Sequence, residues 1–307
     1  MPSKAGMAPI EALVVVPTTS PKRLNEVADR LRRNRLSGSL PEMREQVGGN
    51  PSPVRAGVDF EHTSIAGVAC ELVTPHLLTH ERACIVWLHG GGFCLGSPQR
   101  TRSVASALAA RLRCQVVSVG YRLAPEDPYP AAIDDVVAVH AELARTPGLP
   151  IAFCRASAGG GLAIAATLAI NAGKLPAPVA IAALSPWLDL TCSSATFDLL
   201  APVDPIVAPM TLRSMASMYT ATHDPRTPGI SPVFANFREF PPLLVQVGTS
   251  EILLADSIAV ARAVGACGGS VVLELWVSMF HVWHQLEIDE ASAALDRVCS
   301  FLDSHLR

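Results

Sequence analysis

Short, mostly apolar runs alternate with longer, helix-favouring segments along most of the chain. Runs such as Cys84–Leu88 and 150–154 are apolar at every position, which is typical of strands buried on both faces of a sheet. Segments such as 131–145 and 158–172 have the length and composition of helices. Strands that alternate with helices imply a mostly parallel sheet covered on both faces, and ligands bind at the carboxyl ends of such strands. The other strands are predicted at 54–65, 68–73, 115–119, 179–184, 243–247 and 271–277, the first two as an antiparallel pair, and the other helices at 104–112, 210–220, 251–264 and 285–304.

Two segments depart from this alternation. Residues 1–50 contain a predicted amphipathic helix at 21–31 and a second short helix at 41–47. The apolar stripe of the first helix must cover something, either a pocket, as a flap, or a membrane surface. The segment at about 188–240 is rich in proline and interrupts the strands. We expect both segments to form a helical cap on an α/β domain made by residues 51–307.

Composition narrows the classes of function. Half of the 307 residues are hydrophobic and 17% are charged, which is enough apolar material for a substantial core. The net charge of −3 argues against nucleic acid as a partner. No run reaches the roughly 20 apolar residues of a membrane span, so we expect no stable membrane insertion.

Cysteine usage and the first residues indicate the compartment. The eight cysteines form no C-x-x-C pair, and several lie in apolar runs, as buried reduced thiols do. The apolar stretch 8–16 contains Glu11 and is followed by Pro17, which makes a poor secretory signal. We therefore predict a cytoplasmic protein.

Ser157 stands where a predicted strand ends and a predicted helix begins. This is the context of a nucleophile elbow, and the N–H of Ala158 at the helix start could stabilise a negative oxygen. The usual elbow sequence is G-x-S-x-G. Here Gly159 supplies the second glycine, but Arg155 stands in place of the first. An ordinary turn or a helix N-cap is the alternative interpretation.

Three consecutive glycines follow the predicted strand Cys84–Leu88. The backbone N–H groups of Gly91 and Gly92 can point at a developing negative oxygen, and losing one such donor typically costs about 3 kcal/mol of transition-state stabilisation. A flexible turn or a phosphate cradle would be the alternatives, although no G-x-x-x-x-G-K-[ST] pattern follows. We interpret the preceding His89 as a hydrogen-bond donor that orients the loop.

A serine nucleophile needs a base, and the base needs an orienting group. His281 and His284 both follow the last predicted strand, and each could instead be a surface residue or half of a metal site. Glu251 follows the strand before it, whereas Asp256 lies further into the next helix. Glu251 is the better candidate, and an ordinary glutamate in the first turn of a helix is the alternative. The chain order Ser157, Glu251, His281 is that of α/β-hydrolases.

The sequence resembles the bacterial hormone-sensitive-lipase-like esterases of the α/β-hydrolase superfamily over nearly its whole length. The resemblance implies an α/β-hydrolase fold with a mostly parallel eight-stranded sheet flanked by helices, a helical cap and no cofactor. It implies a small-molecule ester substrate with a short to medium acyl chain, hydrolysed through an acyl-enzyme, and a homodimer formed through the last strand, 271–277. The marks of the resemblance are the segments 89–93, 121–126, 128–132, 134–135, 157–160, 184–190, 247–248 and 281–283 together with Glu251.

The resemblance also assigns roles to individual residues. It makes Ser157 the nucleophile, Glu251 the orienting carboxylate and His281 the general base. His281 is preferred over His284 because the family's base directly follows the loop after the last strand. The oxyanion N–H groups would come from Gly91, Gly92 and Ala158.

Three positions depart from the family pattern. Ala156 replaces the usual aspartate, Glu251 replaces the usual aspartate of the triad, and Arg155 replaces the elbow glycine. Elbow strain of ~1–3 kcal/mol is harder to hold beside a bulky residue, and Arg155 could extend into solvent, distort the turn or plug the pocket. The alternative is therefore an impaired pseudoenzyme or a small-ligand binder. A lactone or amide hydrolase is a variant within the enzyme class, and a lipase acting at lipid surfaces is a third hypothesis.

Overall fold

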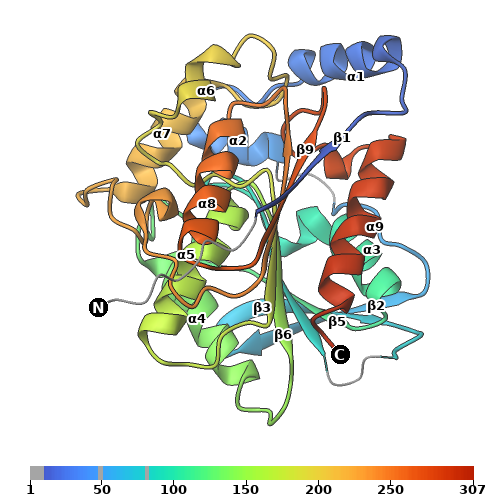
Figure 1. Cartoon of the computed structure of the whole chain (residues 1–307), viewed down its shortest axis with the longest axis vertical. Coiled ribbons are helices and arrows are strands. Elements are labelled where there is room, and N and C mark those ends of the chain that lie inside the picture. The colour runs from blue at the N-terminus through green and yellow to red at the C-terminus, as the bar shows by residue number, and fades with distance from the viewer. Residues whose placement is uncertain (1–9, 48–50, 80–82) are drawn as a thin grey trace.

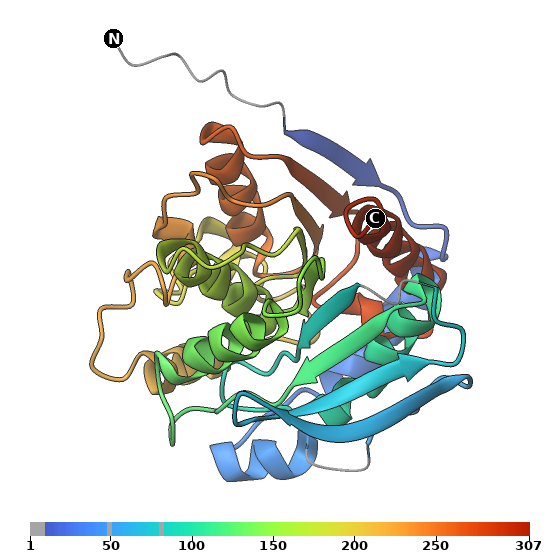
Figure 2. The ribbon, with the colours of Figure 1, turned by 90° about the horizontal axis from the view of Figure 1, so that it is seen from below.

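The computed structural model describes residues 10–47, 51–79 and 83–307, and a nine-stranded sheet forms its centre (Figures 1 and 2). The strands are β1 (Glu11–Val15), β2 (Val58–Ile65), β3 (Val68–Pro75), β4 (Cys84–Leu88), β5 (Gln115–Val119), β6 (Ile151–Ala156), β7 (Ala180–Leu184), β8 (Leu243–Gly248) and β9 (Val271–Trp276). Their order in the sheet is β1-β9-β8-β7-β6-β4-β5-β3-β2. Only β3 pairs antiparallel with its neighbours β2 and β5, so the predicted mostly parallel sheet is confirmed.

Helices cover both faces of the sheet, as the wholly apolar strands require. Figure 1 shows α3 (Arg102–Leu112) and α9 (Asp289–Asp303) on one face and α4 (Ala131–Leu143), α5 (Ala158–Ala172) and α8 (Leu254–Ala266) on the other. The five helices predicted on the two faces of the sheet are all present, and their ends differ from the predicted ends by a few residues. Side chains of β6 alternate between the two faces: Cys154 and Ala156 lie in the core cluster on the α3–α9 side, and Phe153 lies in the cluster on the α4–α5 side.

The predicted count of eight strands is wrong by one, because β1 adds a ninth. This strand pairs in parallel with β9, with Glu11 opposite Val272 and Val15 opposite Trp276. The first 50 residues therefore supply a sheet strand as well as cap helices. A five-residue apolar run that begins with a glutamate has no pattern that distinguishes a strand from other short apolar segments.

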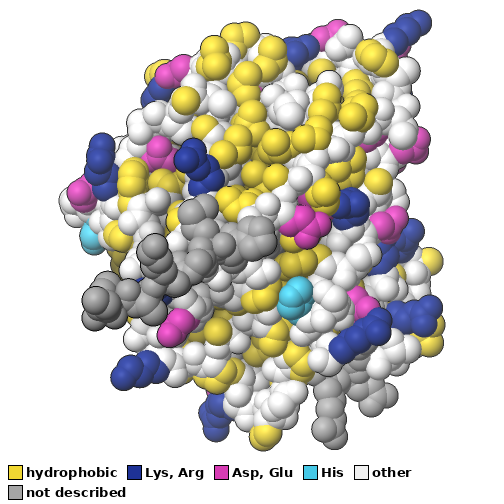
Figure 3. Space-filling model, viewed as in Figure 1, with side chains coloured by type: hydrophobic (Ala, Val, Ile, Leu, Met, Phe, Trp, Pro, Cys, Tyr) yellow, Lys and Arg dark blue, Asp and Glu magenta, His cyan; other side chains and the backbone are white. Residues whose placement is uncertain are grey.

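β1 also changes the outer edge of the sheet. Both edges of β9 are paired within the chain, one with β8 and one with β1. A homodimer built on 271–277 remains a prediction, and it would require β1 to be displaced. Figure 3 shows hydrophobic side chains on the face that β1 crosses, and Val14 and Val16 of this region are 65% and 70% exposed.

The helices predicted to form a cap come from two separate pieces of chain. The first contains α1 (Pro21–Arg33) and α2 (Leu40–Val47), and the second contains α6 (Ala195–Leu199) and α7 (Pro209–Thr220). The apolar stripe of α1 packs on the end of β9 and the segment that follows it, where Trp276, Phe280 and Trp283 are buried, so this stripe covers protein. Among the described residues, no helix is long and apolar enough to cross a membrane. The division into a cap and a domain at 51–307 stays a prediction.

Candidate active site

The elbow at Ser157 forms between β6 and α5 despite the missing glycine. Ser157 has a positive φ of 56° with ψ −128°, a conformation that a non-glycine residue holds only where its surroundings impose it. The Ser157 N–H donates to the Leu184 carbonyl at 2.9 Å, and the Ser157 carbonyl accepts from Gly160 at 2.8 Å. Gly159 is required, since a Cβ there would lie 2.6 Å from the Leu88 carbonyl oxygen. The sheet and α5 together hold the strained serine.

Arg155 neither reaches solvent nor blocks the cavity. Its side chain is fully buried and donates to the Leu88 carbonyl at 3.0 Å and to the Val86 carbonyl at 3.3 Å. The guanidinium lies 5.8 Å from the centre of the Phe153 ring, which belongs to the α4–α5 side of the sheet. Within the described residues no carboxylate pairs with it, and burial lowers its pKa to about 9. Strand alternation directs residue 155 away from the elbow, into a space beside β4.

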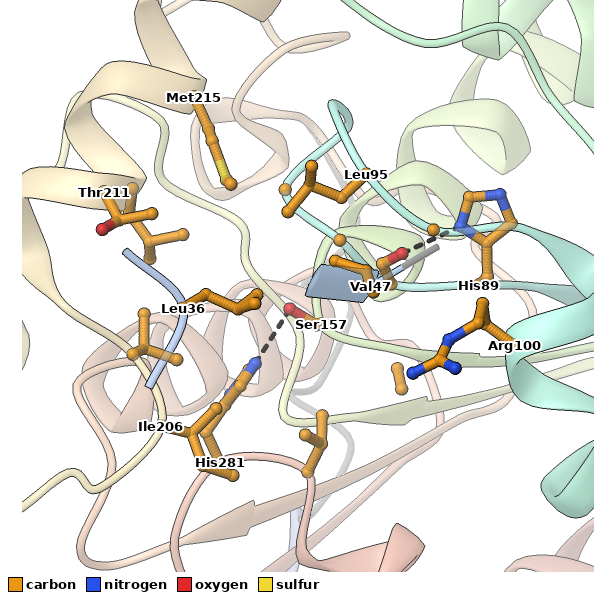
Figure 4. Close-up of a pocket in the computed structure, with 18 of the residues that line it drawn as sticks. Leu36, Val47, His89, Leu95, Arg100, Ser157, Ile206, Thr211, Met215 and His281 are labelled. Atoms are coloured by element: carbon orange, nitrogen blue, oxygen red, sulfur yellow. Dashed lines mark hydrogen bonds between the residues drawn. The ribbon is translucent and has the colours of Figure 1, made fainter. Parts of the chain in front are cut away.

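The predicted base and acid lie next to the serine. The Ser157 hydroxyl lies 2.9 Å from Nε2 of His281, and Nδ1 of His281 lies 3.4 Å from Oε2 of Glu251 (Figure 4 shows the first contact). The second distance is longer than a normal hydrogen bond, and catalytic contacts often shorten only as the transition state forms. Glu251 is fully buried and His281 nearly so. Burial raises the pKa of Glu251, and the contact with His281 opposes this rise.

The structure brings His281, and not His284, to the serine. Nε2 of His284 lies 3.0 Å from Oε1 of Gln246, so this imidazole points into a different polar cluster. Burial lowers the pKa of His284 to about 3, which keeps the ring neutral. The two histidines therefore do not share a site.

The glycine loop lies opposite His281 in the same cavity. Gly91 and Gly92 have φ values of 123° and 61°, and both line the cavity together with Ser157. A Cβ would lie 2.2 Å from the Leu95 carbonyl oxygen at Gly91 and 2.2 Å from Sδ of Met215 at Gly92, so neither position admits another residue without movement. In the described part of the chain, the N–H groups of Gly91, Gly92 and Ala158 donate no turn or loop hydrogen bond to a backbone carbonyl.

His89 holds this loop as predicted. Its ring is buried and stacks on Tyr121 at 4.2 Å, and its Nδ1 lies 2.8 Å from the Gly90 carbonyl, to which it donates. The Tyr121 hydroxyl donates to the His89 carbonyl at 2.7 Å. Burial lowers the pKa of His89 to about 4, so the imidazole is neutral and acts on the loop through hydrogen bonds.

Residues of both predicted cap pieces line the cavity at the strand ends. The cavity has a volume of about 260 Å³, and residues from both cap pieces form its apolar wall (Figure 4). The cap residues in this wall are Leu36, Val47, Ile206, Val207, Leu212 and Met215.

Asp204 is a site residue that sequence reasoning missed. It is fully buried, and its carboxylate accepts from the N–H groups of Ile206 at 2.9 Å, Val207 at 3.0 Å and Ile252 at 3.2 Å. Its negative charge contributes to the raised pKa of Glu251. The Asp204 carboxylate thus connects two residues of the cavity wall to Ile252, the residue after Glu251. The only sequence signal was an Asp-Pro pair in a proline-rich segment, which is typical of turns.

Replacement of Asp204 by alanine is expected to destabilise the fold by about 3–5 kcal/mol and to lower kcat. The change leaves three N–H groups, two of them buried, without an acceptor and releases the segment that carries Glu251. Asp204→Asn keeps an acceptor oxygen and should lose less of both. Urea unfolding together with ester hydrolysis measures the two effects. Equal stability of the wild type and Asp204→Ala would contradict this role.

Known proteins show the same architecture. A sequence model described as the alpha/beta hydrolase fold matches residues 85–285. An acetyl-hydrolase of Streptomyces hygroscopicus is 38% identical over 222 residues, which are 71% of this chain and 74% of that protein. An esterase of Acinetobacter venetianus is 31% identical over 304 residues, 96% of this chain and 95% of that protein. The crystal structure of an esterase from the bacterial hormone-sensitive lipase family matches with a TM-score of 0.88 at 32% identity, covering 94% of this chain and 100% of that chain.

The fold and these matches define the class as α/β-hydrolase. Within this class, the chain belongs to the bacterial hormone-sensitive-lipase-like esterases. It is accordingly a carboxylic ester hydrolase.

Proposed function

We propose that the chain is a serine carboxylesterase that cleaves short- to medium-chain acyl esters through an acyl-enzyme. The observation that carries this proposal is the contact of 2.9 Å between the Ser157 hydroxyl and Nε2 of His281, with Glu251 3.4 Å behind the imidazole. A hydroxyl, a base and an orienting carboxylate in this arrangement are the parts of a nucleophilic triad.

In the first half-reaction Ser157 Oγ attacks the ester carbonyl carbon while Nε2 of His281 accepts the hydroxyl proton. Glu251 holds the Nδ1–H tautomer and stabilises the imidazolium that forms. The tetrahedral intermediate then breaks its bond to the alcohol oxygen, and His281 returns the proton to that oxygen. The products are a free alcohol and an acyl group on Ser157.

The negative oxygen of each tetrahedral intermediate needs donors fixed in advance. We assign this role to the N–H groups of Gly91, Gly92 and Ala158, which belong to the glycine loop and the start of α5. In the second half-reaction water attacks the acyl carbon, His281 accepts a proton from the water, and Ser157 leaves as the hydroxyl. The carboxylic acid is released and the resting state returns.

Cavity size supports a small substrate. About 260 Å³ lies just below the roughly 300–1,000 Å³ of pockets that hold drug-sized ligands. The apolar cap wall suits an acyl chain of a few carbons. A lactone of similar size would meet the same groups, so lactone hydrolysis stays a variant within the class.

The alternative of an impaired enzyme or ligand binder depended on Arg155. Its buried position, with hydrogen bonds to β4, leaves the elbow and the Ser157–His281 contact in place. This favours an active esterase over a binder.

Active-site labelling tests the proposal. The chain should hydrolyse p-nitrophenyl acetate and butyrate faster than the octanoate, and phenylmethanesulfonyl fluoride should abolish this activity. Mass spectrometry should then find the sulfonyl group on the peptide that contains Ser157. Hydrolysis that survives full labelling of Ser157, or the absence of hydrolysis, would contradict the proposal.

A cytoplasmic location remains a prediction. All eight cysteines are free thiols, and seven of them are buried. Unpaired thiols are usual in reducing compartments.

A further inference from the structure

Ser185 is a buried serine next to the strands that carry the proposed nucleophile and acid. It directly follows β7, and its side chain is fully buried. Its N–H donates to the Gln246 carbonyl of β8 at 2.7 Å. The carbonyl of the preceding residue, Leu184, accepts from the Ser157 N–H at 2.9 Å. The reaction proposed above assigns no role to the Ser185 hydroxyl.

The Ser185 hydroxyl contacts both the base loop and the acid. Its oxygen accepts from the Val282 N–H at 3.2 Å, and Val282 is the residue after His281. A hydroxyl that accepts one hydrogen bond still has its own proton to donate. The neighbouring acceptor is Glu251, whose pKa is raised by burial and lowered by contacts with His281 and with Ser185. In the described part of the chain, neither Glu251 oxygen makes a hydrogen bond of normal geometry, so the carboxylate can accept the Ser185 proton as well as the Nδ1–H of His281.

Two residues with strained backbones meet at this contact. Ser185 has a φ of 47° and Val282 a φ of 49°, in the left-handed region that residues other than glycine seldom adopt. Strain of this kind persists only where the surroundings impose it, and it is concentrated at active sites. The hydrogen bond from Val282 to Ser185 joins the two residues and holds the peptide that follows His281.

The groups around Glu251 show what a hydroxyl donor contributes there. Burial disfavours the charged carboxylate, and the negative charge of Asp204 repels it. His281 lies 3.4 Å away, but it must be neutral in the resting enzyme to accept the proton of Ser157. A hydroxyl donor, by contrast, stabilises the carboxylate both before and after the imidazolium forms.

We propose that Ser185 is a positioning residue of this esterase, whose hydroxyl donates to Glu251 and accepts from the Val282 N–H. It thereby holds the acid and the base loop in the active arrangement and keeps the acid ionised. The proposal rests on the esterase function proposed above and adds a residue to its machinery. Ser185 does not line the cavity, so it acts through Glu251 and His281 and should affect kcat far more than KM.

Removal of the hydroxyl tests this role. Ser185→Ala should lower kcat for p-nitrophenyl butyrate about 10- to 100-fold, the range for a hydrogen bond to a charged group, with little change in KM. The acid limb of its kcat profile should move to higher pH by about one unit, because Glu251 without this donor binds a proton more readily. Folding should be preserved, since the Ser250 N–H also joins the two loops by donating to the Met279 carbonyl at 2.9 Å.

Two matched variants separate the hydroxyl from the backbone and from general stability. Ser185→Gly adopts the φ of 47° without strain but lacks the hydroxyl, so it should be as slow as Ser185→Ala. Ser106→Ala removes a buried hydroxyl of α3 that accepts from the Arg55 N–H at the same distance, 3.2 Å. This variant should lose stability in urea and keep the wild-type kcat and acid limb.

A double variant tests whether Ser185 acts through the acid. In a Glu251→Gln background, Ser185→Ala should lower kcat much less than it does in the wild type, because the charge that the hydroxyl supports is already absent. Activated p-nitrophenyl esters keep the residual rates measurable.

Two kinds of failure are distinguishable. Wild-type kcat or an unshifted acid limb in Ser185→Ala, wild-type kcat in Ser185→Gly, or an equal loss in the Glu251→Gln background would overturn the role of Ser185 and leave the esterase proposal standing. Absence of hydrolysis by the wild type would overturn the esterase proposal itself. If Ser185→Ala fails to fold, Ser185→Gly gives the same test, because glycine fits both the φ and the space.

Discussion

Replacement of Ser157 by alanine is expected to lower kcat for p-nitrophenyl butyrate by about 10⁴- to 10⁶-fold, the range seen when a triad nucleophile is removed. The substitution deletes only Oγ, the atom that lies 2.9 Å from Nε2 of His281. The backbone hydrogen bonds of the elbow remain, so folding should be preserved. Steady-state hydrolysis and urea unfolding of the wild type and the variant measure both expectations.

Two comparisons make this prediction specific. Ser214→Ala alters an exposed serine of α7 and should leave kcat unchanged. The double variant Ser157→Ala, His281→Ala should be about as inactive as Ser157→Ala alone, because a nucleophile and its base act as a unit. If the two losses multiplied, or if Ser157→Ala kept more than a few per cent of the activity, Ser157 would not be the nucleophile.

The strand ends that carry the candidate site could be predicted from the sequence. Mostly apolar runs before the glycine loop, Ser157 and Glu251 indicated parallel strands, and such strands end at the same edge of a sheet. His281 follows the next strand, β9, which is the neighbour of β8. The proximity of the glycine loop, Ser157, Glu251 and His281 therefore follows from the pattern of strands and from the order of these residues along the chain.

β1 and Asp204 could not be predicted in this way. The partner of β1 is β9, at the opposite end of the chain, and no local feature of Glu11–Val15 points to it. The role of Asp204 depends on three backbone N–H groups that come from two loops. Long-range backbone pairing of this kind leaves no periodic signal in a single sequence.

The position of the Arg155 side chain also could not be predicted in full from the sequence. Alternation along β6 predicts which face of the sheet residue 155 occupies. Whether that face offers room beside β4, and carbonyl groups to accept hydrogen bonds, depends on packing. The structure offers both, at the carbonyls of Val86 and Leu88. The arginine is therefore part of the support below the glycine loop, since Leu88 directly precedes His89.

Replacement of Arg155 by glycine, the residue usual at this point of an elbow, is expected to destabilise the fold by about 3 kcal/mol or more. The change removes two charge-assisted hydrogen bonds and leaves a cavity of nearly a whole side chain in the core. Relief of the buried charge offsets part of this loss. Because the strand end before the glycine loop loses its support, kcat should also fall, by about tenfold.

Urea unfolding and ester hydrolysis of three variants separate these contributions. Arg155→Met fills most of the space without the hydrogen bonds and should be more stable than Arg155→Gly, yet similarly slow. Arg155→Lys keeps a charge that can reach one carbonyl and should recover part of the activity. The opposite result, an Arg155→Gly variant more active than the wild type, would mean that the arginine impairs the elbow. In that case the strained φ of 56° at Ser157 would be better held with glycine two residues before it.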